Sequence, residues 1–133
     1  MHGRRLPLPA PVVRRVVRGV LRGERRRVHV SVTFLGRDRM RRLNAQYLGH
    51  DQPTDVLAFT LRQPDGPALA DVYVCAAVAA AAARGHRVPL RQELVRLVVH
   101  GTLHALGYDH PEGPERGRSA MWRRQERYVK ALA

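Results

Sequence analysis

The chain has 133 residues, of which 44% are hydrophobic and 26% are charged, a size and balance that suit one domain spanning residues 1–133. Its one cysteine, Cys75, excludes a scaffold of internal disulfides, and no apolar run approaches the about 20 residues of a membrane span. The 24 lysines and arginines outnumber the 11 acidic residues and give a net charge of +13, which favours RNA or DNA as the large partner.

The N-terminal part is basic and leads into the first predicted helix. Residues 1–11 contain arginines and prolines but lack the continuous apolar block of a secretory signal, so a cytoplasmic protein is expected. From Pro11 to about Arg22, valines and Leu21 recur at helical spacing, and arginines fall on the opposite face. We expect the valines to cover the core and the arginines simply to face solvent. The more specific alternative is that the arginines contact phosphate groups.

The next part of the chain predicts a strand, a helix and two more strands. Alternating apolar residues indicate a strand over Val28–Leu35. A helix is predicted over Asp38–Leu48, ended by the cluster at residues 49–53. Strands at Val56–Leu61 and Leu69–Cys75 flank a turn at residues 63–67, which suits an antiparallel hairpin. In the helix predicted over Asp38–Leu48, three side chains are expected to face the core: Met40, Leu43 and Tyr47.

The remaining part of the chain is predicted to be helical. Residues 76–84 are almost all alanine, which strongly favours helix. A long helix follows from about Pro89 to Leu106, where Gly107 stops it, and a last helix runs from about Glu112 to Leu132 with Trp122 capping the core. The whole pattern predicts an α+β fold, a small mixed sheet of three to four strands packed with about five helices.

The most informative segment lies at the end of the long helix, where residues 100–110 read HGTLHALGYDH. His100 and His104 are four residues apart, so on a helix they share a face with Cβ atoms about 5–6 Å apart and can converge on one ion. Gly107 tolerates the left-handed conformation that ends a helix, which lets His110 reach the same point. The spacing therefore predicts a metal site made of three imidazoles.

Three imidazoles leave the fourth position of a tetrahedral zinc ion open, as in catalytic rather than structural zinc sites. A metal ion there lowers the pKa of bound water and polarises phosphoryl or carbonyl oxygens, which indicates hydrolysis. The plainer alternative is three ordinary polar residues near a helix end. It is disfavoured because three of the seven histidines fall within eleven residues. The donor set leaves Zn, Ni, Cu and Fe open, and zinc is the expected ion.

The histidine spacing also matches the metzincin protease pattern H-E-x-x-H-x-x-G-x-x-H, with one decisive difference. Gly101 stands where those proteases carry the glutamate that serves as general base, so peptide hydrolysis by that mechanism is not expected. Asp109 could orient a histidine or relay a proton, or it could be a turn residue. Glu93 and Arg96 could help to fix the ring of His100, but an exposed ion pair at i, i+3 is the expected arrangement.

The histidine segment resembles the signature of the YbeY family of metal-dependent endoribonucleases, H-G-x-L-H-L-x-G-Y-D-H, with Ala105 in place of the usual leucine. Two further blocks are similar to those of the family: residues 43–47, LNAQY, to L-N-x-x-Y-R, and residues 53–59, PTDVLAF, to P-T-D-V-L-S-F. A weaker match joins residues 70–75, ADVYVC, to G-D-[IL]-x-[IL]. The resemblance covers roughly residues 28–132.

The resemblance implies a metal-dependent endoribonuclease, specific for single strands, that acts in ribosomal RNA processing and ribosome maturation. It implies one divalent ion on His100, His104 and His110, with the metal helix beside a sheet-lined cleft. Thr54 and Asp55 are the candidate substrate contacts in that cleft, and a role in the turn that enters the strand is the alternative for both. The implied partners are RNA, especially ribosomal RNA, and ribosomal subunits, with no membrane and no small-molecule cofactor.

One departure from the family pattern concerns a phosphate contact. The arginine that follows the tyrosine of L-N-x-x-Y in the family is Leu48 here. The resemblance implies that the family's arginine faces the cleft and contacts substrate phosphate. Arg41, Arg42 or Arg62 could take its place, and otherwise activity would be weak.

Three functions are therefore compared. The first is a metal-dependent endoribonuclease that hydrolyses phosphodiesters with a metal-activated water. The alternative is a non-catalytic, RNA-binding ribosome-assembly factor with a structural metal, which Leu48 favours. A metalloprotease is retained only because of the ligand spacing. Cleavage of single-stranded RNA with and without a chelator distinguishes the first two.

Overall fold

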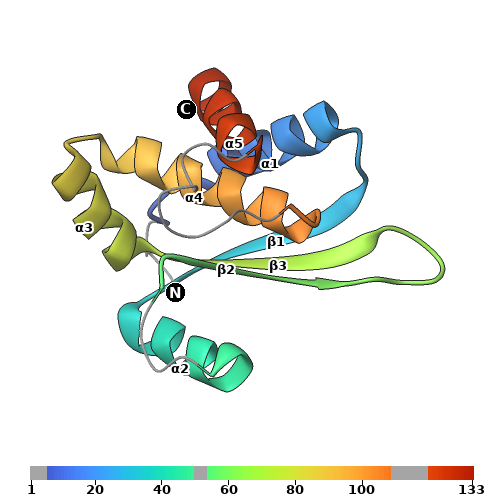
Figure 1. Ribbon diagram of the computed structural model, residues 1–133, viewed down its shortest axis with the longest axis horizontal. Helices are drawn as coiled ribbons and strands as arrows, with labels where there is room; N and C mark the ends of the chain where they lie inside the picture. The colour runs from blue at the N-terminus through green and yellow to red at the C-terminus, as the bar shows by residue number, and fades with distance from the viewer. Residues whose placement is uncertain (1–5, 50–53, 109–119) are drawn as a thin grey trace.

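Eight helices and strands make up the parts of the chain that the computed structural model describes, residues 6–49, 54–108 and 120–133 (Figure 1). The predicted elements are present, and apart from the start of the last helix their described bounds differ from the predictions by at most two residues. Residues 112–119, where the last helix was predicted to start, lie outside the described ranges. No helix within these ranges is long and apolar enough to span a membrane. The elements are α1 (Ala10–Glu24), β1 (Val28–Leu35), α2 (Arg37–Leu48), β2 (Val56–Leu61), β3 (Ala68–Cys75), α3 (Ala76–His86), α4 (Leu90–Ala105) and α5 (Ala120–Leu132).

The strands form one mixed sheet in the order β1-β3-β2. β1 pairs with β3 in parallel, with Val28 opposite Ala68. β2 pairs with β3 antiparallel, with Val56 opposite Val74, so the predicted hairpin is confirmed. The fold class predicted from the sequence is also confirmed, because five helices pack with three strands within the described ranges.

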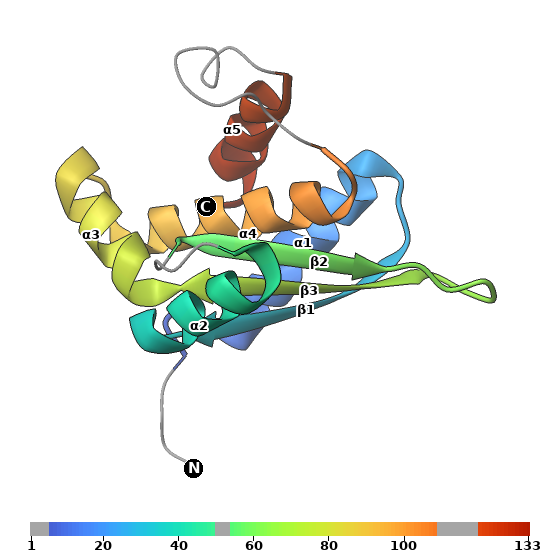
Figure 2. The same cartoon turned by 60° about the horizontal axis from the view of Figure 1, so that its bottom comes forward.

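The helices cover the two faces of the sheet unequally (Figure 2). α1 and α4 lie on one face, where α4 contacts β2 and β3 and α1 contacts β1. α2 lies on the other face and contacts β3. Strand alternation follows this arrangement, since Val72 and Val74 of β3 are fully buried in the larger core while Asp71 between Ala70 and Val72 is exposed. α5 packs on α4 and α1, so α4 is covered by helices on the side away from the sheet.

α2 covers only a small second core. Met40 is fully buried there, against Leu35, Leu57 and Cys75, and Leu43 is partly buried beside them. The prediction that Tyr47 turns inward is wrong, because its side chain is 57% exposed. Its ring lies 5.2 Å from that of Phe59, centroid to centroid, at the edge of the sheet.

α4 approaches the sheet most closely at Gly101. A Cβ at this position would clash with Cγ1 of Val72 and would lie 3.1 Å from Cγ2 of Val56. The absence of a side chain therefore lets the helix pack directly on β2 and β3. Because position 101 faces the sheet, a glutamate there could not enter the histidine site, which agrees with the sequence argument against the protease mechanism.

Candidate active site

His100 and His104 occupy one face of α4, and their ring centroids are 5.9 Å apart. His100 is half-buried and His104 is exposed to solvent. The turn between the two residues places them side by side, as the i, i+4 spacing requires. Both rings are therefore placed where they could share one ion.

Backbone and side-chain hydrogen bonds fix the end of α4, immediately beyond His104. The N–H of Gly107 donates to the carbonyl of His104 at 3.0 Å, with a φ of +103° that favours glycine. The Thr60 hydroxyl of β2 donates to the carbonyl of Ala105 at 2.9 Å, and the Arg26 guanidinium donates to that of Leu106 at 3.3 Å. The helix end is thus held from two sides. Asp109 and His110, which follow it, lie outside the described residues.

Gln125 of α5 orients the ring of His100. Its Oε1 lies 2.7 Å from Nδ1 of His100, and its side chain is almost completely buried. The amide nitrogen of Gln125 donates to Oε2 of Glu126 at 3.0 Å. A carboxylate can only accept, so the amide orientation is fixed and Oε1 must accept a proton from His100 Nδ1. His100 is therefore the Nδ1–H tautomer, and its Nε2 lone pair can bind a metal ion.

A network of charged side chains holds Gln125 in place through Glu126. Arg96 donates to both carboxylate oxygens of Glu126 at 2.9 Å and to Glu93 at 2.9 Å. Burial raises the pKa of the Glu126 carboxyl, but hydrogen bonds from Arg96 and Gln125 outweigh it and hold that pKa below its usual value. Hydrogen bonding to Glu126 raises the pKa of Arg96 in turn. The expected i, i+3 pair of Glu93 and Arg96 forms, but the prediction that it is exposed is wrong, since Glu93 is buried and α5 supplies a second carboxylate.

A pocket of about 540 Å³ opens beside His100. Asp55, from the segment before β2, lines it together with Gln125 of α5. The backbone carbonyl of Asp55 accepts from the N–H of Cys75 at 2.8 Å, which fixes this segment to β3. Trp122 is half-buried and also lines the pocket. The structure therefore brings Asp55 and His100, two predicted site residues, to one cavity.

The other predicted substrate contacts lie elsewhere. Thr54, beside Asp55, donates a long hydrogen bond of 3.5 Å to its carboxylate. Arg41 and Arg42 are exposed on α2, which lies across the sheet from α4. Arg62 follows the far end of β2, and the six residues of that strand separate it from Asp55 by about 23 Å. These three arginines are not among the described residues that line the pocket.

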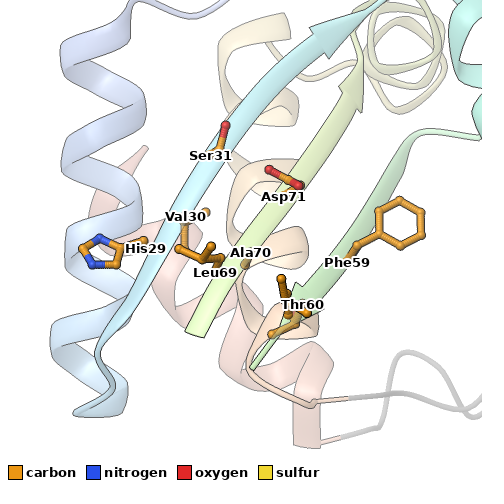
Figure 3. A pocket seen from close by; sticks show the side chains of 9 residues that line it. His29, Val30, Ser31, Phe59, Thr60, Leu69, Ala70 and Asp71 are labelled. Atoms are coloured by element: carbon orange, nitrogen blue, oxygen red, sulfur yellow. The ribbon is translucent and has the colours of Figure 1, made fainter. Parts of the chain in front are cut away.

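A second hollow of about 380 Å³ lies on the sheet face that α1 and α4 leave open (Figure 3). All three strands contribute to it, with His29 and Ser31 from β1, Phe59 from β2 and Asp71 from β3. The histidines of α4 do not line it. His29 therefore belongs to a surface separate from the candidate site.

The donors near α4 suit a divalent ion that prefers nitrogen ligands. Within residues 6–49, 54–108 and 120–133, no group of three histidine, cysteine or acidic side chains is placed to hold a metal ion. The third predicted ligand, His110, is outside these ranges. Two neighbouring imidazoles, one with its tautomer fixed for coordination through Nε2, fit the predicted ion.

Comparisons with known proteins agree with the resemblance found in the sequence. The family model described as "Endoribonuclease YbeY" matches residues 10–133. A protein of that name from Thermotoga petrophila is 38% identical over 105 residues, 79% of this chain and 68% of the relative. One from Bordetella pertussis is 44% identical over 87 residues, 65% of this chain and 55% of the relative. A protein from Thermotoga maritima, solved in solution, superposes with a TM-score of 0.63 and 33% identity over 90% of this chain and 78% of that one.

Proposed function

Because the chain belongs to the YbeY family of endoribonucleases, we propose that it cuts single-stranded RNA with a divalent ion bound by His100, His104 and His110. The observation that carries the proposal is the hydrogen bond of 2.7 Å between Gln125 and His100. A buried glutamine that accepts from Nδ1 of a histidine is the partner expected for an imidazole that binds a metal ion through Nε2. Zinc is the proposed ion because imidazole nitrogen suits it.

The described residues of the site have three roles: they bind the ion, orient the ring of His100 and hold Gln125 in place. A divalent ion bound there supplies Lewis-acid chemistry, which neutralises charge on a phosphate and activates water. Gln125 holds the Nδ1 proton of His100, and Arg96 keeps Glu126 ionised so that Glu126 holds Gln125. Asp55 also lines the pocket, and we assign its carboxylate, together with the Thr54 hydroxyl, to hydrogen bonding with ribose.

We propose ribosomal RNA as the substrate and the cytoplasm as the compartment, in keeping with the family's role in ribosomal RNA processing. The net charge of +13 supports a polyanionic partner. Asp109 is proposed to orient His110 or relay a proton. The alternative, an RNA-binding assembly factor without catalysis, is favoured by Leu48, which leaves the family's arginine position without a cation.

A chelator-controlled assay tests the proposal directly. Purified protein loaded with zinc is incubated with single-stranded RNA, and a second sample is first stripped with a chelator. We expect cutting by the loaded protein, loss of cutting after stripping, and recovery when zinc is returned. Binding on a gel that survives chelation, with no cutting in either sample, would select the assembly factor instead.

Replacing Gln125 with methionine, which has a similar shape, is expected to weaken metal binding by about 10- to 100-fold. The reason is that His100 loses the acceptor that fixes its tautomer and ring orientation. Competition with a chromophoric chelator measures the affinity, and the ¹⁵N shifts of the His100 ring report its tautomer. Gln46→Met on exposed α2 is the matched control. Unchanged affinity and an unchanged tautomer in Gln125→Met would show that the contact has no positioning role.

A further inference from the structure

The outer face of α1 concentrates positive charge. Residues 10–27 contain seven arginines and one glutamate, so this stretch carries +6 of the chain's +13. Four of the arginines, Arg14, Arg15, Arg18 and Arg22, are exposed on the helix. Glu24 does not neutralise them, because its side chain is only 4% exposed and binds Arg124. We call these four exposed arginines the α1 arginine face.

The α1 arginine face has an energetic cost in the free protein. Arg14 and Arg18, and then Arg18 and Arg22, are like charges at i, i+4, and each such pair destabilises a helix by about 0.2–0.5 kcal/mol. The first turn of α1 has no acidic residue to offset them. Within the described ranges no ion pair reaches any of the four. Bound anions would relieve this repulsion.

A groove of about 410 Å³ runs beside these side chains. The four arginines line it together with Gly19 and Leu132, the last residue of α5. Leu132 packs against Gly19, so the end of α5 provides an apolar floor beside the guanidinium groups. Arg14, Arg18 and Arg22 follow one another along the axis at intervals of about 6 Å. That interval resembles the spacing of successive phosphates in an extended single strand.

We propose that the α1 arginine face binds the sugar-phosphate backbone of the RNA substrate outside the cutting site, an inference that rests on the proposed function. Guanidinium groups bind phosphate through paired hydrogen bonds, and they desolvate more readily than ammonium groups. α5 connects the two sites: Gln125 contacts His100, and Leu132 lines the groove seven residues later, about 10 Å along the helix axis. The groove and His100 are therefore linked by one short stretch of α5, and the proposal is that one RNA strand reaches both.

Two matched variants test the proposal. The first replaces the α1 arginine face with glutamines: Arg14→Gln, Arg15→Gln, Arg18→Gln and Arg22→Gln. The second removes the same charge from exposed arginines elsewhere: Arg37→Gln, Arg39→Gln, Arg84→Gln and Arg91→Gln. Arginine and glutamine have similar helix propensities, so both variants should fold. Circular dichroism checks this, and binding is then measured on single-stranded RNAs of about 4 and about 16 nucleotides.

The longer RNA should reveal the role of the α1 arginine face. Loss of four phosphate contacts should raise its Kd at least about tenfold and reduce the slope of log K against log salt by about 3. The KM for cutting the longer RNA should rise with kcat unchanged, while the short RNA should be bound and cut as before. The second variant should behave like the unaltered protein on both RNAs.

The binding measurements are also made with chelator present, so they do not depend on cutting. If the unaltered protein never cuts RNA but the α1 variant still loses affinity for the longer RNA, the nuclease proposal fails. The proposal that the α1 arginine face binds RNA is then still supported. Three results would overturn the proposed RNA-binding role of the α1 arginine face: an unchanged slope of log K against log salt, equal losses of affinity in the two variants, or equal losses of affinity for both RNAs. Preference for anionic lipid vesicles over RNA would overturn it as well.

Discussion

Replacing His104 with alanine is expected to abolish metal retention and RNA cleavage together. His104 is exposed on the last turn of α4, so its removal leaves the buried core untouched. Two imidazoles would then remain of the proposed three, too few to hold zinc against a chelator. We expect cleavage to fall by about a thousandfold or more, since the step depends on the ion's activation of water. Metal analysis after desalting and a timed cleavage assay measure the two losses.

His29→Ala is the matched control for this substitution. His29 is also an exposed histidine, but it lines the separate hollow on the open face of the sheet. The control should retain both metal and cleavage. Cleavage that persists in the metal-free His104→Ala protein would rule out the proposed mechanism.

Replacing Glu24 with alanine is expected to have the largest effect on stability, lowering the free energy of unfolding by about 3 kcal/mol or more. The Glu24 carboxylate accepts hydrogen bonds from Tyr108 at 2.6 Å, from Tyr128 at 2.5 Å and from Arg124 at 3.1 Å. It thereby joins α1 to α5 and to the residue that follows the turn after α4. Without it, two phenols and a guanidinium lose their common acceptor. Urea unfolding followed by circular dichroism measures the difference.

The same carboxylate predicts the direction of a pH effect. Burial raises the pKa of Glu24, but hydrogen bonds from the two tyrosines and Arg124 outweigh it and hold that pKa below the ordinary value of 4.5. A group whose pKa is lower in the folded state stabilises the fold above its unfolded pKa. Its contribution is therefore complete above pH 4.5 and is lost as the pH falls through the lower folded value. Glu24→Gln should lack this part of the acid transition.

Asp65→Ala is the control for Glu24→Ala because it removes an acidic side chain that is exposed to solvent in the hairpin turn. It should change the free energy of unfolding by less than about 0.5 kcal/mol. If Glu24→Ala were no less stable than Asp65→Ala, the buried carboxylate would not be holding these helices together.

The elements of the fold could be predicted because local patterns determine them. Alternation predicted β1, the turn at residues 63–67 indicated the hairpin of β2 and β3, and helical spacing predicted α1 through the valines that pack in the core. Tyr47 was misplaced because periodicity shows which residues share a helix face but not how far the neighbouring sheet extends. α2 meets the sheet mainly through Met40, and Tyr47 is beyond that contact.

The support of the candidate site could not be predicted, because its contacts join residues far apart in the chain. The histidine spacing is a local property of one helix, so His100 and His104 were found. Gln125 is 25 residues from His100, and Glu126 is 30 residues from Arg96. Glu24 was missed for the same reason, since its partners are at least 84 residues away in the chain. It is also the last residue of an arginine-rich helix, where a glutamate is expected to be exposed to solvent.

The central place of β3 has a consequence for the order in which the chain can fold as it is synthesised. β2 and β3 are neighbours in sequence and can form their hairpin early, whereas β1 must wait for a partner whose first residue lies 40 positions later. Until Cys75 has emerged, the apolar side of β1 has no sheet to join. The parallel β1–β3 ladder is therefore expected to be the late, slow step of assembly, and a nascent chain is most vulnerable to aggregation before it forms.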